Sequence, residues 1–341
     1  MTGARARRAL VTGFTGQDGS FLSELLLEQG YEVTGMVRGA PREPLGASEH
    51  LRDRVHLVVG DLADPPSLRA AVHGSAADEV YHLAAPSYVP RSWERPGETM
   101  SAIVAGTAAV LEAVRELGSS SRVFVAASGA MYGDAGAVPQ DEQTPCRPDN
   151  PYAVAKLAAH QLVGALREHD GLYACSGIVF NHESERRSPA FVTRKVTRAA
   201  AAISLGLASE CRLGDLDAVR DWSFAGDVMR GAWMTLQHAT AGDYVLASGV
   251  ARTVGELARV AFACVDLEFE RFVRVDPELV RTPEGTPSVG DAGRARRELG
   301  WEPRVTFGEL VERMVRADLA DLGSPAARVG RSHAPLTCPP P

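Results

Sequence analysis

The sequence has almost no lysine. Of its 36 basic residues only Lys156 and Lys195 are lysines, and the others are arginines. In a chain that uses arginine so generally, a retained lysine indicates a position that needs a compact ammonium with a tunable pKa, which arginine does not provide. Both lysines are therefore candidate functional residues.

Other absences exclude several classes of protein. The five cysteines are scattered, odd in number and without the spacing of a zinc site, which argues against a disulfide framework or a bound metal and indicates the reducing cytoplasm. No apolar run is long enough to cross a membrane, and the basic residues 1–8 lead directly into a strand pattern, so we expect no signal peptide. The formal charge of −7 argues against a nucleic-acid partner.

Lys156 stands four residues after Tyr152, in the helix-compatible run 151–156. This spacing places both side chains on one face of a helix. An ammonium beside a phenol favours the ionised phenolate, so Tyr152 is a candidate proton acceptor for the oxidation of an alcohol. The alternative is a packed ring beside a solvated ammonium.

A glycine-rich turn, residues 13–19, follows the apolar strand pattern of residues 9–12 and precedes an apolar helix pattern. Glycines spaced in this way let the backbone approach a pyrophosphate held at a helix N-terminus, as in dinucleotide-binding sites. A second strand pattern at residues 32–37 supports that context. The cofactor-binding candidates in the turn are Gly13, Thr15, Gly16, Gln17, Asp18 and Gly19.

The second strand pattern ends at Arg38 and has no carboxylate at its tip. A carboxylate there would bind the ribose hydroxyls of NAD, whereas an arginine favours the extra phosphate of NADP, so we expect NADP, with NAD as the alternative. Asp61 and the adjoining Leu62 are candidates for contact with the adenine. The small Ala84 and Ala85 would let the cofactor lie against the backbone.

Alternating strand and helix patterns predict an α/β fold with a doubly wound parallel (Rossmann) sheet and a smaller C-terminal α/β substrate domain. The expected strands are residues 9–12, 32–37, 55–59, 79–85, 123–127, 172–180 and 243–247. Helices are expected over 99–117, around Tyr152, over 191–195 and twice within 251–321, and a loop over 181–187. The predicted domains are 1–180 with a return segment at about 221–250, then 181–220 with 251–323, then a disordered tail at 324–341.

Several stretches of the chain carry a resemblance to a known family. They are residues 12–20 (Thr-Gly-Phe-Thr-Gly-Gln-Asp-Gly-Ser), 150–156, 180–184 (Phe-Asn-His-Glu-Ser), 191–195 and 216–222. The chain resembles the extended short-chain dehydrogenase/reductase superfamily over about residues 8–320. Within it the chain is most similar to the GDP-mannose 4,6-dehydratase family of nucleotide-sugar epimerases and dehydratases.

The resemblance implies a GDP-sugar substrate and a catalytic group of Ser128, Tyr152 and Lys156. Tyr152 would take the proton of the sugar 4-hydroxyl while a hydride passes from C4 to the nicotinamide, and Ser128 would hydrogen-bond the same oxygen. The implied substrate contacts are Ser87 in the active-site loop 85–90, Asn181 and Arg220 at the diphosphate, and Val192, Lys195, Arg281 and Glu284 at the nucleoside.

One departure from the family bears on the reaction. The family's dehydratases carry Thr-x-Glu after the fifth strand, where the Glu removes the C5 proton, but this chain reads Ser128-Gly129-Ala130. Alanine can serve neither as acid nor as base, a contribution of roughly 10²–10⁴-fold. We therefore expect an NAD(P)-dependent epimerase that acts by transient C4 oxidation on a GDP-mannose-like or longer sugar. The alternatives are a GDP-mannose 4,6-dehydratase with a displaced base, for which Asp141 and Glu142 are the nearest acids in sequence, and a non-catalytic NADP-binding protein.

A second departure bears on assembly. In the family an Arg-Arg-Ser-type loop after the second strand reaches a neighbouring subunit's cofactor, whereas residues 37–44 here read Val-Arg-Gly-Ala-Pro-Arg-Glu-Pro. We therefore expect a homodimer through the helices before and within the Tyr152 segment, with a tetramer as the alternative.

Overall fold

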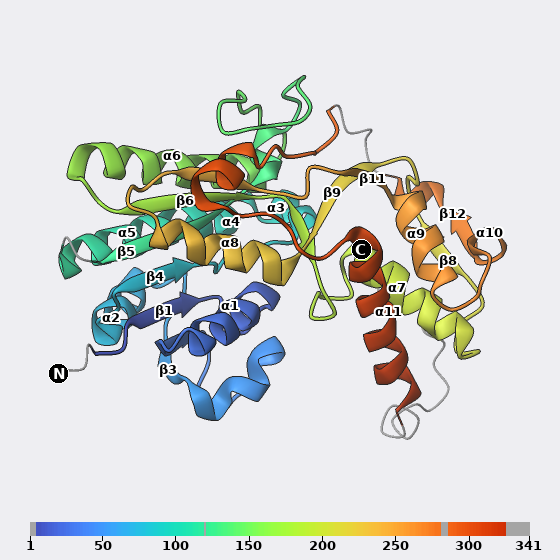
Figure 1. The fold of residues 1–341 in the computed structure, drawn as a ribbon, viewed down its shortest axis with the longest axis horizontal. Coiled ribbons are helices and arrows are strands. Elements are labelled where there is room, and N and C mark those ends of the chain that lie inside the picture. Colours follow the sequence, from blue (N-terminus) through green and yellow to red (C-terminus); the bar gives the residue numbers. More distant parts are fainter. Residues whose placement is uncertain (1–4, 119–120, 281–285, 325–341) are drawn as a thin grey trace.

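Figure 1 shows the fold in a computed structural model that describes residues 5–118, 121–280 and 286–324. Arg281, Glu284 and residues 325–341 of the expected tail lie outside the described residues. Within the described ranges, no helix combines the length and the apolar character needed to cross a membrane. The same ranges hold no group of three or more His, Cys, Asp or Glu side chains arranged to bind a metal ion.

A seven-stranded parallel sheet forms the larger part of the molecule. Its strand order is β10-β6-β5-β4-β1-β2-β3, so the chain winds outward in both directions from β1 and β4. The doubly wound sheet predicted from the sequence is confirmed. Its strands are β1 (Arg8–Thr12), β2 (Glu32–Val37), β3 (His56–Val59), β4 (Glu79–His82), β5 (Arg122–Ser128), β6 (Ala174–Val179) and β10 (Asp243–Leu246).

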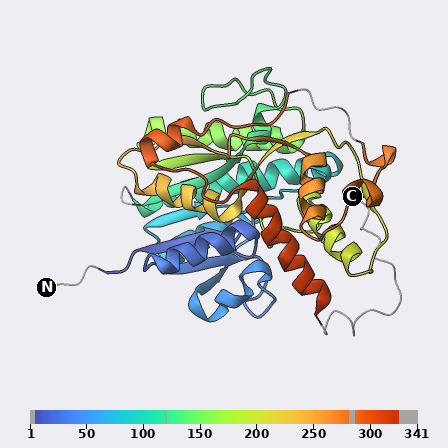
Figure 2. The same cartoon turned by 45° about the vertical axis from the view of Figure 1, so that its right-hand side comes forward.

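Helices cover both faces of this sheet (Figures 1 and 2). On one face α1 (Gln17–Glu28) packs beside α8 (Ala225–Gln237), and their buried side chains share a core with β1 and β4. On the other face α2 (Pro65–Ser75), α5 (Gly106–Leu117) and α6 (Pro151–Asp170) enclose a second core. Burial on both faces explains why the strands are continuous apolar runs in the sequence.

The long helix before α6 differs from its prediction. It begins at Pro96 rather than residue 99, and it passes from α4 (Pro96–Met100) through a π-helical turn, η2 (Ser101–Ala105), into α5. Ile103 of this turn is buried against Ala155 of α6, and Tyr152 packs against the same cluster. Between β4 and α4 lies the short helix α3 (Val89–Glu94).

A smaller part of the molecule follows β6. The strands β7 (Asn181–Glu183), β9 (Val219–Phe224) and β11 (Ala251–Thr253) form one sheet, and β8 (Cys211–Leu213) pairs with β12 (Val273–Val275). The loop predicted over 181–187 is therefore wrong in its first three residues, which pair with β9 about forty residues away, a partner that local sequence does not reveal. The domain boundaries themselves stay a prediction.

The remaining helices pack around these two small sheets. Three of them, α7, α9 and α11, share one buried core, in which Arg194 of α7 is paired with Asp318 of α11. Their bounds, with those of the shorter helical segments, are α7 (Val192–Ser204), α9 (Val254–Ala263), α10 (Phe269–Phe272), α11 (Phe307–Gly323), η1 (Gly46–Arg54), η3 (Gly129–Tyr132), η4 (Pro277–Leu279) and η5 (Ala295–Leu299).

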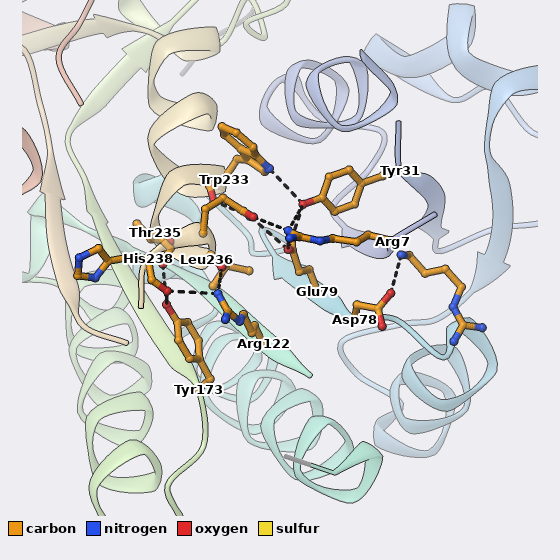
Figure 3. A network of polar contacts seen from close by, with 12 residues as sticks. Arg7, Tyr31, Asp78, Glu79, Arg122, Tyr173, Trp233, Thr235, Leu236 and His238 are labelled. Atoms are coloured by element: carbon orange, nitrogen blue, oxygen red, sulfur yellow. Dashed lines mark hydrogen bonds and ion pairs between the residues drawn. The ribbon is translucent and has the colours of Figure 1, made fainter. Parts of the chain in front are cut away.

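A buried carboxylate closes the amino end of the large sheet (Figure 3). Glu79, at the start of β4, is 3% exposed. Its two oxygens accept hydrogen bonds from four side chains, namely Tyr31 at 3.0 Å, Tyr81 at 2.6 Å, Arg7 at 3.2 Å and Gln237 at 3.2 Å. The carboxylate thus joins the residues that directly precede β1 and β2, and the end of α8, to β4 at the edge opposite the carboxyl ends of the strands.

Replacing Glu79 should destabilise the fold. Glu79→Gln replaces one carboxylate oxygen by an NH2 group, which donates and cannot accept, so one of the two tyrosine hydroxyls loses its acceptor. We therefore expect the free energy of unfolding in urea to fall by about 1–3 kcal/mol. The matched control is Asp78→Asn, which alters a more exposed ion pair with Arg5 and should cost at most about 1 kcal/mol. Equal losses in the two variants would contradict this assignment.

Candidate functional site

The glycine-rich turn brings two backbone segments into close approach. Gly13 has a φ of +70°, and a Cβ there would lie 2.9 Å from the backbone nitrogen of Ala84. A Cβ on Gly19 would lie 2.4 Å from the carbonyl oxygen of Gly13. Larger residues would therefore push the turn, β4 and α1 apart. Gly16 is exposed at the N-terminus of α1, where a dinucleotide diphosphate is bound in sites of this kind.

The other cofactor candidates lie along the same edge of the sheet. Arg38 is exposed directly after β2, and Asp61 and Leu62 follow β3, where the Asp61 carboxylate accepts a hydrogen bond from the Ala63 N–H at 2.9 Å. Ala84 and Ala85 follow β4. Because β2 and β4 flank β1, and β3 lies next to β2, these residues stand beside the glycine turn. Thr15 and Gly16 are accessible within the turn itself.

Local signals place Tyr152 at the start of α6. The side chain of Asn150 caps the helix by accepting a hydrogen bond from the Ala153 N–H at 2.9 Å, and Pro151 occupies the first helical position. Tyr152 therefore lies in the first turn and Lys156 in the next, on one face, with the Lys156 ammonium 5.9 Å from the Tyr152 ring centroid. Asn150 and Pro151 thus fix where α6 begins, and with it the position of Tyr152.

Lys156 and Ser128 both connect α6 with β5. The ammonium of Lys156 is buried and donates a hydrogen bond of 2.7 Å to the Ala126 carbonyl oxygen. Ser128 ends β5, and its hydroxyl also accepts from the Ala130 N–H at 3.2 Å. The structure thus brings together the three residues that the resemblance assigns to catalysis, at the carboxyl ends of the strands.

The electrostatics around Tyr152 differ from the expectation. Burial raises the pKa of Tyr152, and a hydrogen bond from Ser128 and the positive charge of Arg187 lower it only in part. Lys156 is not among the groups that lower this pKa, so the predicted direct effect of the lysine is wrong for this structure. Burial instead lowers the pKa of Lys156 to about 8. The negative charge of Asp18 acts in the other direction and raises the pKa of Lys156, but by less.

Arg187 is a functional candidate that sequence reasoning missed. Its guanidinium lies over the Phe191 ring, 3.5 Å from the centroid, and pairs with the buried Glu183 at 3.1 Å. From there its charge reaches Tyr152. The available signal was its place three residues after the Asn-His-Glu-Ser segment that carries the resemblance.

A second missed residue is His182, from the same segment. Its Nε2 lies 2.9 Å from a carboxylate oxygen of Asp18, in the first turn of α1. Gln17 reinforces this contact, because its amide nitrogen donates to the His182 carbonyl oxygen at 3.2 Å and its amide oxygen accepts from Ser184 at 2.7 Å. The glycine-rich turn is thus attached to β7, which carries the predicted substrate residue Asn181.

The described substrate candidates come from four segments. Asn181 of β7 lies opposite Trp222 of β9, and Arg220 stands two residues before Trp222 on β9. Val192 and Lys195 lie in the first turn of α7, and the Lys195 ammonium makes no hydrogen bond or ion pair with a described residue. Ser87 is exposed in the segment between β4 and α3. Arg281 and Glu284 lie outside the described residues, so their predicted role stays a prediction.

No carboxylate in the described ranges takes the place of the family's Glu beside Ala130. Asp141 is occupied by the Gln143 N–H and the Thr144 hydroxyl, and Glu142 accepts from the backbone N–H of Val245 on β10. Among described residues, Asp18 is the one carboxylate whose charge acts on Tyr152. The carboxylates of Asp141 and Glu142 are therefore already engaged in hydrogen bonds that stabilise loop and sheet.

Comparison with known proteins gives consistent relatives. The family model described as GDP-mannose 4,6 dehydratase matches residues 10–314. GDP-mannose 4,6 dehydratase 1 of Arabidopsis thaliana is 43% identical over 323 residues, which cover 91% of this chain and 89% of that protein. A GDP-mannose 4,6-dehydratase of Sinorhizobium fredii is 41% identical over 340 residues, covering 92% and 97%.

Solved structures with the same fold carry nicotinamide cofactors. The dTDP-glucose 4,6-dehydratase DesIV of Streptomyces venezuelae, with NAD bound, has a TM-score of 0.80 at 25% identity and covers 93% of this chain and 98% of its own. RMD of Pseudomonas aeruginosa, complexed with NADPH, has a TM-score of 0.76 at 25% identity, covering 92% and 99%. The UDP-glucose 4-epimerase of Thermus thermophilus, complexed with NAD, has a TM-score of 0.79 at 26% identity, covering 91% and 98%.

These findings weigh on the two reactions that the sequence left open. The sequence relatives are named dehydratases, which favours the alternative expectation, a 4,6-dehydratase, over the epimerase that we expected first. Ala130 remains the feature that speaks for the epimerase.

The low pKa of Lys156 can be measured directly, because the chain has only two lysines. With isotope-labelled lysine, one of the two side-chain NMR signals should titrate at about pH 8, since burial disfavours the ammonium. Lys195→Arg assigns the signals and should leave that titration unchanged. If neither signal titrates near pH 8, the described burial of Lys156 is wrong.

Proposed function

Because the chain belongs to the GDP-mannose 4,6-dehydratase family, we propose that it binds a GDP-linked hexose and a nicotinamide dinucleotide and oxidises C4 of the sugar. The observation that carries this proposal is the convergence of Ser128, Tyr152 and Lys156 beside the glycine-rich turn. A sugar hydroxyl next to Tyr152 would lie between the proton acceptor and the place where a nicotinamide fits.

Residues along the carboxyl edge of the sheet suit the dinucleotide. The turn from Gly13 to Gly19 would hold its diphosphate, Ala84 and Ala85 would allow close approach, and Asp61 with Leu62 would reach the adenine. The exposed Arg38 favours NADP, with NAD as the alternative. When bound, the nicotinamide supplies the hydride acceptor.

The chain's own residues handle the proton. Tyr152 takes it from the 4-hydroxyl, and Ser128 orients the same oxygen by a hydrogen bond. Arg187 and Ser128 favour the phenolate that this step needs, against burial, which raises the pKa of Tyr152. A positioned base of this kind contributes roughly 10²–10⁴-fold to the rate.

The smaller part of the molecule suits the nucleotide of the substrate. Asn181 and Arg220 would bind the diphosphate from adjacent strands. Val192 and Lys195 would contact the nucleoside, together with Arg281 and Glu284. Ser87 would meet the sugar. Lys195 supports this assignment because its ammonium is not engaged by another described residue.

Two outcomes follow oxidation at C4. The names of the relatives support loss of water, which gives a 4-keto-6-deoxy sugar. The second candidate is return of the hydride to the other face of C4, which gives the C4 epimer of a GDP-mannose-like or longer sugar. Ala130 and the engaged carboxylates of Asp141 and Glu142 favour this second outcome, since elimination needs a base at C5.

Assembly and location complete the proposal. We expect a homodimer through α5 and α6, with a tetramer as the alternative. Five scattered cysteines support a place in the reducing cytoplasm.

Product analysis in D₂O tests the function and separates the outcomes. The protein is incubated with NADP or NAD and GDP-mannose or a longer GDP-sugar, and the products are followed by NMR. A 4-keto-6-deoxy product with deuterium at C5 identifies the dehydratase, and a C4 epimer without deuterium at C5 identifies the epimerase. Tyr152→Phe should lower either rate roughly 10²–10⁴-fold. Full activity in that variant, or no NMR product and no NADPH absorbance with any substrate tried, would refute the proposed oxidation.

The role of Ala130 has its own test. Ala130→Glu should raise the yield of 4-keto-6-deoxy product, because it adds a carboxylate next to the predicted position of C5. Ala130→Gln is the matched control, with the same shape and no base, and should give no increase. An equal yield from both variants would show that a missing carboxylate does not limit elimination.

A further inference from the structure

A carboxylate stands where the proposed cofactor would place its own negative charge. Asp18 belongs to the glycine-rich turn and lies in the first turn of α1, and its side chain is 27% exposed. A helix N-terminus attracts anions through its free N–H groups and dipole. An uncompensated carboxylate at that end would compete with, and repel, a dinucleotide diphosphate.

His182 supplies the compensating charge. Its Nδ1 lies 2.7 Å from the Phe180 carbonyl oxygen and its Nε2 lies 2.9 Å from the Asp18 carboxylate. Both partners are acceptors, and a ring that donates from both nitrogens is an imidazolium. Burial lowers the pKa of His182, but the charge and hydrogen bond of Asp18 outweigh burial and raise it above its ordinary value.

Gln17 supports the pair through contacts that reach both Asp18 and the segment of His182. Gln17 donates from one amide nitrogen to Asp18 at 3.0 Å and to the His182 carbonyl oxygen at 3.2 Å. Its amide oxygen accepts from Ser184 at 2.7 Å. A variant that removes one charge therefore keeps the contact between α1 and β7, so an effect of charge can be told from an effect of structure.

The charge of Asp18 also acts on the proposed base. It raises the pKa of Tyr152 and the pKa of Lys156. Burial alone would raise the pKa of Asp18. The charges of His182 and Arg187, with the hydrogen bonds from His182 and Gln17, lower that pKa to about 2. Asp18 is thus ionised throughout the physiological range, and the proton on His182 decides how much of its charge is balanced.

We propose that His182, as an imidazolium, is the counter-ion that lets the Asp18 carboxylate stand in the dinucleotide turn, from where its charge also acts on Tyr152. In this role it sets both the affinity for the dinucleotide and the pH at which Tyr152 acts as a base. His182 is a positioning residue here, since it acts through Asp18. The inference rests on the proposed dinucleotide and on Tyr152 as the base.

The sign of the pH dependence follows from the pair. The ion pair exists where Asp18 is ionised and His182 is protonated, which is above about pH 2 and below the raised pKa of His182. As pH rises through that pKa, Asp18 loses its counter-ion, and dinucleotide affinity falls. Apart from Asp18, the charged group that acts on His182 is Arg187, which opposes its protonation.

The first measurement uses His182→Gln in the full chain. NADPH binding, followed by fluorescence, should weaken about tenfold, the effect of one unbalanced charge at a helix N-terminus. The rising limb of the pH–rate profile should move upward by about one pH unit, because Asp18 then raises the pKa of Tyr152 more strongly. The control is His50→Gln, which removes a histidine that is paired at 2.5 Å with another carboxylate of α1, that of Glu24. This variant should change neither the NADPH affinity nor the pH–rate profile.

The second measurement is a rescue. In the double variant Asp18→Asn/His182→Gln both charges are gone, so NADPH affinity and the pH profile should return toward those of the parent protein. A purely structural role predicts that the double variant is as impaired as His182→Gln or worse. That outcome, or a His182→Gln variant indistinguishable from the parent, would overturn the inference.

Two further readouts keep the test decisive. If His182→Gln does not fold, NADPH affinity of the parent protein is measured across the NMR titration of His182, and an affinity that stays constant through that titration refutes the inference. If the parent protein binds neither NADPH nor NADH, the proposed function fails, and the failure does not concern the ion pair.

Discussion

The hydroxyl of Thr12 fixes the edge on which the site is built. At the end of β1 it accepts hydrogen bonds from the backbone N–H groups of Leu83 and Ala84, both at 3.1 Å. Its own proton can go to Nδ1 of His82 at 2.9 Å, because burial lowers the pKa of that histidine to about 3 and keeps the ring neutral. This is why β4 ends at His82, three residues before the prediction, and why Gly13 meets Ala84.

The larger part of the molecule could be predicted from the sequence, for a physical reason. Strands buried on both faces are apolar runs, and a glycine turn between such a run and a helix is typical of a dinucleotide site. Contacts across long separations were out of reach. The pairing of β7 with β9 and the ion pair of Asp18 with His182 join segments with no shared local pattern. The pKa of Tyr152 was misjudged because burial, which the spacing to Lys156 does not reveal, is the largest influence.

The proposed oxidation and the step that would follow it differ in the residues available for them. Ser128 hydrogen-bonds Tyr152, and the two charges that act on the pKa of Tyr152, those of Arg187 and Asp18, come from different segments of the chain. Nothing comparable surrounds Ala130 within the described residues, since Asp141 and Glu142, the nearest acids in sequence, stabilise loop and sheet instead. Under the proposed function, the side chain at position 130 would decide the product while the residues proposed for oxidation stay the same.

The π-helical turn η2 makes the position of Tyr152 depend on a single inserted residue. A π turn holds one residue more than the α-helix around it, and each residue of an α-helix advances the side chains by about 100°. Because the turn presents Ile103 to Ala155 and to the cluster around Tyr152, deleting one residue from 101–105 would regularise the backbone and rotate one side of the helix out of register. The length of this segment is therefore constrained more tightly than its composition. An apolar exchange at Ile103 changes packing locally, whereas a one-residue deletion would shift the side chains that pack against Ala155 and Tyr152.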